Sequence, residues 1–107
     1  MRPITLKEFK EFPLGDAELV SIIWDGTDPN LWIELALYTH KRVRFRFDWV
    51  SGLSVHLDQE EKGQLYGYSW DVSAEQIGPT RNKVLFDFAG QGSITFEFAE
   101  LGVEDLN

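Results

Sequence analysis

The chain has 107 residues, of which 43% are hydrophobic and 26% charged, and it has a formal net charge of −8 and no cysteine. The length predicts a single domain, residues 1–107, and the lack of cysteine excludes disulfides, thiolate nucleophiles and cysteine-based metal sites. An acidic surface repels the phosphates of nucleic acids and membranes, and the charged N-terminus lacks the apolar core of a signal peptide, so we expect a cytoplasmic protein that binds neither.

One short helix is predicted near the N-terminus. Thr5-Leu-Lys-Glu8 has the spacing of a capping box, in which the Thr hydroxyl and the Glu carboxylate accept hydrogen bonds from free backbone N–H groups. Pro13 ends the helix because it cannot continue one. We expect Leu6, Phe9 and Phe12 to pack over a sheet.

A first strand is predicted over residues 17–24. Apolar residues occupy both alternating sides of this segment, which favours a central strand or one covered on both faces. Residues 25–30 follow and are rich in turn formers.

Residues 31–38 and 42–49 are predicted to pair as antiparallel strands. The second of them has one apolar face, formed by Val43, Phe45, Phe47 and Trp49, and it alternates with charged side chains. Keeping the two apolar faces together places Leu37 opposite Val43 and Glu34 opposite Arg46. The arginines at 42, 44 and 46 are then expected to form salt bridges with Glu34 and neighbouring acids.

The chain after Trp49 has two interpretations. Either 50–52 is a three-residue loop with Gly52 at positive φ, or a bent strand continues, and both keep Leu53, Val55 and Leu57 on the apolar side. A charged loop at 58–63 precedes a strand at 65–72.

The last part of the chain contains the clearest hairpin. Residues 73–79 are expected to form one capped helical turn, after which 84–98 form two strands around Gly90 and Gly92. The tail, 99–107, adds acidic residues and no basic one. We therefore expect a mainly β protein, α+β at the margin, with about six antiparallel strands in a curved sheet or open barrel and one short N-terminal helix.

The sequence has few residues in patterns typical of catalytic or metal sites. His40 and His56 lack the spacing of zinc ligands and are expected on the surface, and Gly90-Gln-Gly92 lacks the lysine of a phosphate loop. Asp87 and Glu97 share one face of the hairpin, so we expect them to be offset, bridged by a cation, or functional. The sequence predicts no cofactor, no metal and no enzyme activity.

Three stretches resemble small immunity proteins of bacterial polymorphic-toxin systems. Phe12-Pro-Leu-Gly-Asp-Ala-Glu-Leu-Val-Ser-Ile22 is similar to their F-H-D-A-E-L-x-S-I opening, although Gly15 stands where that pattern has His. Residues 43–50 are similar to their V-x-L-x-F-x-x-V strand, and 86–103 to their closing hairpin. The resemblance implies an antiparallel β-rich fold in a protein that binds and neutralises a cognate toxin.

We accordingly predict stoichiometric binding of a cognate toxin or another basic protein through an acidic surface with aromatic anchors. The candidate partner-binding residues are Asp58, Glu60, Glu61, Tyr66, Trp70, Glu100, Glu104 and Asp105. The alternative is a β module that binds a small ligand or a carbohydrate. An enzyme that uses two of Asp71, Asp87 and Glu97 ranks last.

Overall fold

The computed structural model describes residues 1–58 and 71–106. Within these ranges the chain forms nine β-strands, one α-helix and one 3₁₀ turn. In chain order they are β1 (Arg2–Pro3), α1 (Leu6–Glu11), β2 (Glu18–Asp25), β3 (Asn30–Ala36), β4 (Arg42–Asp48), β5 (Ser51–Leu57), β6 (Asp71–Gln76), β7 (Asn82–Asp87), η1 (Ala89–Gln91), β8 (Gly92–Phe98) and β9 (Glu100–Asp105).

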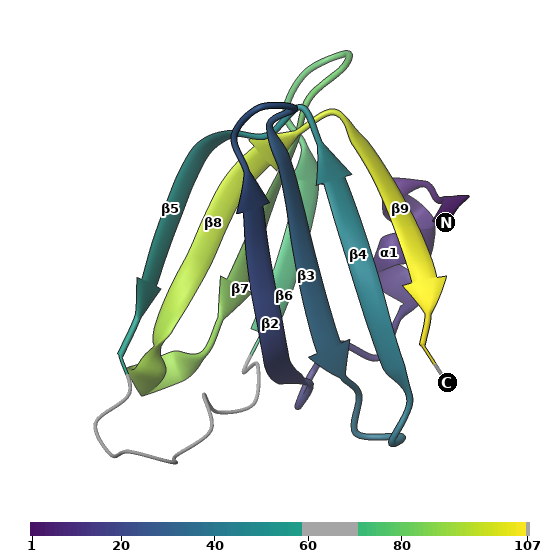
Figure 1. Cartoon of the computed structure of the whole chain (residues 1–107), viewed down its shortest axis with the longest axis vertical. Coiled ribbons are helices and arrows are strands. Elements are labelled where there is room, and N and C mark those ends of the chain that lie inside the picture. The colour runs from purple at the N-terminus through teal and green to yellow at the C-terminus, as the bar shows by residue number, and fades with distance from the viewer. Residues whose placement is uncertain (59–70, 107) are drawn as a thin grey trace.

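The strands form two antiparallel sheets that face each other (Figure 1). One sheet has the order β1-β9-β4-β3-β2 and the other has the order β5-β8-β7-β6. The prediction of a mainly β, antiparallel protein with a short N-terminal helix is confirmed. The expectation of about six strands in one curved sheet or open barrel differs from this arrangement, because the chain changes sheet between β4 and β5 and again between β8 and β9.

The hydrophobic core lies between the two sheets. The ring centroid of Phe47 in β4 is 4.8 Å from that of Phe96 and 4.9 Å from that of Phe98, both in β8. Phe9 of α1 lies against both layers, with centroid distances of 5.0 Å to Phe45 and 6.3 Å to Phe86. The phenylalanines of β4 and of the C-terminal hairpin therefore share one interior, and α1 packs over it as expected.

The predicted C-terminal hairpin is also confirmed. Val84 lies opposite Phe96 and Phe86 lies opposite Ile94, in β7 and β8. Gly92 follows the turn with a φ of 121°, and a Cβ atom at this position would lie 1.8 Å from the backbone oxygen of His56 in β5. Only glycine fits here, because the end of β5 pairs with the start of β8 and its backbone approaches Gly92 closely.

The pairing of β3 with β4 is confirmed, but its register was predicted wrongly by two residues. Leu35, and not Leu37, lies opposite Val43, and Glu34 lies opposite Arg44. The three-residue loop lies at 38–40, one residue earlier than the predicted register requires, and His40 at its end adopts a φ of 69°. A shift of two residues leaves every side chain on its predicted face.

Trp49 was expected on the buried face of β4, and this prediction is wrong. β4 ends at Asp48, and Trp49 takes a φ of 59° that turns its side chain outward, where it is 60% exposed. Val50 is buried in its place, and Ser51 starts β5 in the other sheet. Trp49 and Val50 therefore connect one sheet to the other. Neither a loop nor a bent strand within a single sheet describes this connection, although Gly52 does have the expected positive φ, 62°.

Two further segments differ from the sequence-based expectation. Residues 73–76 belong to strand β6 and do not form a helical turn, because they pair with β7 and place Val72 and Ala74 against the core. The acidic tail forms β9, which lies between β1 and β4. Of the strand predicted over 65–72, only residues 71 and 72 lie within the described ranges.

Candidate functional site

Strand β2 lies at the edge of its sheet and exposes large apolar side chains. It pairs with β3 on one side, and no described strand lies on its other side. Ile23 is 57% exposed, Trp24 47% and Val20 44%. The prediction that this segment is central or covered on both faces is wrong, because its second apolar face points to solvent and not to a second layer.

The pairing with β3 explains why these side chains are exposed. Val20 has no partner in the register, because the pairing shifts between Leu19 and Ser21. From Ser21 to Asp25 the register is regular, with Ile23 opposite Trp32 on the outer face of the sheet. The guanidinium of Arg46 lies over the Trp32 ring at 5.7 Å from its centroid, so Trp32 is partly covered while Ile23 is not.

The charges around β2 have one sign. Glu18 and Asp25 are its first and last residues, and Asp16 and Asp28 lie in the adjoining turns. The sequence has no lysine or arginine between Lys10 and Lys41. An apolar edge between carboxylates is complementary to a surface that is both apolar and basic.

The arginines of β4 are occupied elsewhere on the same sheet. The carboxylate of Glu34, which is 6% exposed, forms ion pairs with Arg42 and, at 3.3 Å, with Arg44. Arg46 forms an ion pair with Asp48 at 3.0 Å. The predicted salt bridges of Arg42, Arg44 and Arg46 with Glu34 and neighbouring acids are thus confirmed. These ion pairs involve other acids than the four carboxylates at the ends of β2 and in its adjoining turns.

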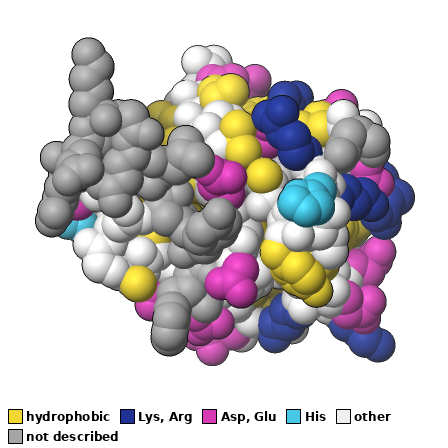
Figure 2. Space-filling model, turned by 90° about the horizontal axis from the view of Figure 1, so that it is seen from below, with side chains coloured by type: hydrophobic (Ala, Val, Ile, Leu, Met, Phe, Trp, Pro, Cys, Tyr) yellow, Lys and Arg dark blue, Asp and Glu magenta, His cyan; other side chains and the backbone are white. Residues whose placement is uncertain are grey.

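A groove of about 540 Å³ adjoins the start of β2. Asp16 and Glu18 line one part of it, and Tyr38, which is 63% exposed, and His40 line another. Figure 2 shows this end of the molecule, with a histidine and hydrophobic side chains next to acidic and basic ones. The groove extends the exposed edge around the end of the sheet, because Glu18 belongs to both.

Of the eight residues predicted from sequence as partner-binding, the four that lie in the described ranges are not all at one end of the fold. Asp58 follows β5 and is exposed, whereas Glu100 is exposed at the start of β9, at the opposite end of that strand from Glu104 and Asp105. Glu104 pairs with Arg44 at 3.7 Å, and Asp105 with Lys41 at 3.4 Å. The other four predicted residues, Glu60, Glu61, Tyr66 and Trp70, lie outside the described residues.

The acids of the C-terminal hairpin have structural partners. Glu97 lies opposite Lys83 and within 4.0 Å of Arg81, while Asp87 accepts a hydrogen bond of 2.8 Å from the backbone N–H of Ala89 in the turn. Asp87 and Glu97 are therefore offset along the strands, and a cation accompanies Glu97. Asp71 lies opposite Asp87 at the start of β6.

No group of three or more histidines and carboxylates in 1–58 and 71–106 has the arrangement of a metal site.

A cleft of about 640 Å³ lies between the N-terminal segment and the β6–β7 loop. The described residues that line it include no tryptophan or tyrosine, and so they form no aromatic platform for stacking on a sugar. Arg81 in its wall is bound, since it donates a hydrogen bond of 2.7 Å to the backbone oxygen of Trp49 and another to Ser51 Oγ.

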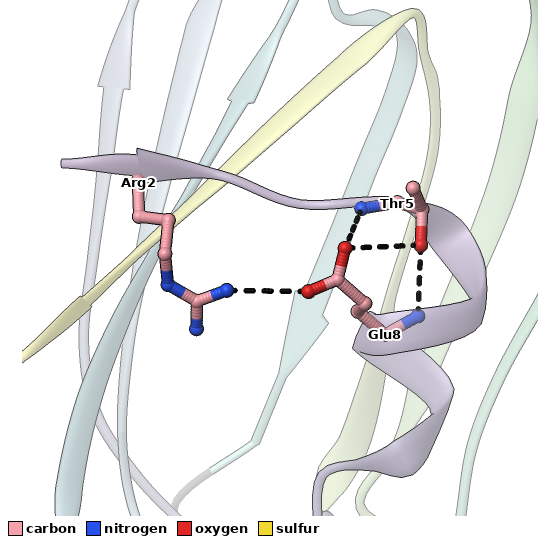
Figure 3. Close-up of polar contacts among 3 residues, drawn as sticks. All are labelled: Arg2, Thr5 and Glu8. Carbon is pink, nitrogen blue, oxygen red and sulfur yellow. Dashed lines mark hydrogen bonds and ion pairs between the residues drawn. The ribbon is translucent and has the colours of Figure 1, made fainter.

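The polar cluster at the start of α1 is the predicted capping box, which is confirmed (Figure 3). The backbone N–H of Glu8 donates to Thr5 Oγ1 at 3.1 Å, and the backbone N–H of Thr5 donates to Glu8 Oε1 at 3.2 Å. Arg2 donates to the other carboxylate oxygen at 3.2 Å. The hydrogen bond from the Thr5 backbone is the main cause that lowers the pKa of the Glu8 carboxyl, and the cluster is explained by helix capping.

Comparison of this chain with described protein families, with curated proteins and with solved structures found no match. The similarity to immunity proteins rests on the three stretches quoted above. In the described part of the chain, no helix is both long enough and apolar enough to cross a membrane.

Sequence reasoning missed the β2 edge although a signal was present. The two apolar faces of residues 17–24 suggested burial, but the same segment lies in the long stretch without lysine or arginine. A strand buried on both faces rarely has carboxylates at both ends and in both flanking turns, so charge and hydropathy together favour an exposed, partner-binding strand.

Proposed function

We propose that this protein acts by stoichiometric binding to a basic protein partner, in the manner of an immunity protein that neutralises a cognate bacterial toxin. The observation that carries the proposal is the exposed apolar edge of β2 between carboxylates. Ile23 and Trp24 supply the kind of apolar and aromatic area that dominates protein interfaces. Glu18 and Asp25 supply charges that accelerate encounter with a basic surface.

The nature of the partner rests on the resemblance to immunity proteins. Toxins that act on nucleic acids carry basic surfaces, and an acidic protein that covers such a surface blocks access to the substrate. The excess of carboxylates in this chain, 18 against 10 basic residues, supports the same reading. The partner therefore belongs to the class of basic proteins, with a toxin as the specific proposal.

A small-ligand or carbohydrate module is the second candidate, and one observation favours it. The exposed Tyr38 ring lies in the groove with Asp16 and Glu18, which suits a small cationic or sugar ligand. This groove has a single aromatic ring, whereas β2 exposes three large apolar residues in one strand. The protein-binding proposal accounts for more of the exposed apolar surface.

The test is coexpression with the product of the neighbouring gene, followed by copurification and measurement of the mass ratio. We expect a complex with equal numbers of the two chains, and restored growth of cells that otherwise die from the neighbour alone. A neighbour that is harmless, or that stays toxic and does not copurify, contradicts the proposal.

Charge-reversal variants then locate the interface. Glu18→Lys and Asp25→Lys should lower the association rate and weaken its dependence on salt, because they remove attraction at the β2 edge. Asp58→Lys and Glu100→Lys are the matched controls, since these exposed acids belong to the set predicted from sequence and lie after β5 in the other sheet and at the start of β9, which does not pair with β2. Equal or larger effects of the two controls would move the interface away from this edge.

A further inference from the structure

We infer that β2 binds its partner by strand addition, so that an extended segment of the partner pairs with the free side of β2 and enlarges the sheet. This inference rests on the proposed function and names its binding mode. The partner segment is apolar in its middle and carries lysine or arginine at its ends.

Of the four edges, that of β2 is the least protected against pairing. β1 has two residues and one of them is Pro3, which lacks a backbone donor. α1 packs against β6. β5 has a register irregularity between Ser51 and Ser54, after which it pairs regularly with β8 over only the four residues 54–57.

β2 carries few such safeguards over its second half. Its irregularity is confined to Leu19–Ser21, and from Ser21 to Asp25 the pairing with β3 is continuous. The strand has no lysine and no proline, the residues that natural edges most often use against pairing. No described strand pairs with the outer side of this stretch, and its five residues, 21–25, come close to the usual strand length of about five to six residues.

The charges on β2 select a basic segment over a second copy of this chain. In an antiparallel pair of two β2 strands centred on the strand, Glu18 of one copy would lie opposite Asp25 of the other at both ends. Like charges directly opposite each other destabilise a sheet. Lysine or arginine at the same positions of a partner strand would form cross-strand pairs of opposite charge, so the charges favour a basic partner and oppose self-pairing.

The side chains of β2 define what the middle of the segment must be. Ile23 points to the outer face next to Trp32, and Trp24 lies on the alternate side, opposite Leu31. A partner strand would lie against exposed apolar groups on both of its faces. Apolar residues in the middle of the partner segment would bury these side chains, whereas polar residues would leave them exposed to solvent.

The probe is a synthetic acetylated peptide of the same length as β2, with lysine at both ends and valine and threonine between them. Amide hydrogen exchange of the whole chain, measured by NMR with and without peptide, reports which backbone groups become paired. We expect slower exchange confined to β2, and binding weakened at least about tenfold in Ile23→Lys, since a cation at an interface centre opposes a basic peptide. Val55→Lys, on the exposed edge strand β5, is the matched control and should bind as the parent does.

Three further measurements decide the outcome. A peptide with N-methylated valines, which lacks backbone donors, should bind at least about tenfold more weakly if backbone pairing is the mode. Equal binding by that peptide, protection outside β2, no binding at all, or sedimentation of the free protein as a β2-dependent dimer overturns strand addition. Melting temperatures of Ile23→Lys and Val55→Lys show that loss of binding is not loss of folding.

The same variants separate this inference from the proposed function. If Ile23→Lys still forms the complex with the neighbouring gene product as tightly as the parent, strand addition is wrong while protein binding stands. If the peptide pairs with β2 but no toxin complex forms, the edge is confirmed as a pairing site and the immunity proposal fails.

Discussion

Replacing Phe9 by alanine tests whether α1 holds the two sheets together. The ring is almost fully buried, and its centroid lies 5.0 Å from Phe45, 5.9 Å from Phe47 and 6.3 Å from Phe86. Truncation of a buried phenylalanine costs about 3–5 kcal/mol, and the three edge-to-face contacts place Phe9→Ala at the upper end. A domain of this size is stable by about 5–15 kcal/mol, so the variant loses a large share of its stability.

Phe12→Ala is the matched control from the same segment. Phe12 is half-buried and has one ring contact, with Phe45 at 5.2 Å, so its truncation should cost about 1–2 kcal/mol. Urea unfolding followed by tryptophan fluorescence should show a midpoint lowered by about 2 M for Phe9→Ala, with a slope near 2 kcal/mol per M. A loss for Phe9→Ala no larger than that for Phe12→Ala would show that α1 does not join the layers through this ring.

Three other substitutions test local features of the structure. Gly92→Ala should destabilise the fold by more than about 3 kcal/mol in urea unfolding, because its Cβ would overlap the backbone of β5. Gly90→Ala is the control, since no atom lies within 4 Å of the new Cβ, and it should change stability by less than about 1 kcal/mol. Similar values for the two would contradict the close approach of β5. Glu34→Gln should lower the free energy of unfolding, measured in urea, by about 1–2 kcal/mol because it removes the carboxylate that pairs with two arginines. Glu104→Gln, at a more exposed ion pair, should lower it by less than about 0.5 kcal/mol. Equal decreases would mean that burial of Glu34 does not strengthen its ion pairs. Because the pKa of Glu8 is lowered in the folded state, its carboxylate stabilises the fold fully above the ordinary glutamate pKa near 4.3, and this effect is lost as the pH falls through the lower folded-state pKa. The difference in melting temperature between Glu8→Gln and the parent should therefore shrink in acid. A difference that does not depend on pH would refute this role.

Local patterns in the sequence were sufficient for those elements whose signal lies within a few residues. The capping box from Thr5 to Glu8 satisfies backbone groups three residues apart, so its spacing alone predicts the start of α1. Alternation in β4 predicted its buried face up to Phe47, and matching alternation in 84–98 predicted the hairpin. In each case the interacting residues are neighbours in the chain.

The candidate site was not predicted, because an edge strand and a central strand have the same local pattern. Residues 17–24 are apolar on both sides in either case, and only the order of the described strands shows that β2 is the last strand of its sheet. Of the residues predicted to bind a partner, the acids were chosen for their charge, and Tyr66 and Trp70 as aromatic anchors. The structure shows that Glu104 and Asp105 already have cationic partners, which charge counting does not reveal.

The sequence by itself determined the mainly β character, the short helix and the face that each of the clearest strands buries, because alternation and capping act over a few residues. Only the tertiary structure decided that the chain leaves its first sheet at Trp49, that residues 71–76 are a strand, and that the acidic tail forms β9 beside β4. These outcomes depend on which distant segments meet across the core. Pairing between segments far apart in the chain is set by the joint burial of both layers, and no window of sequence contains that information.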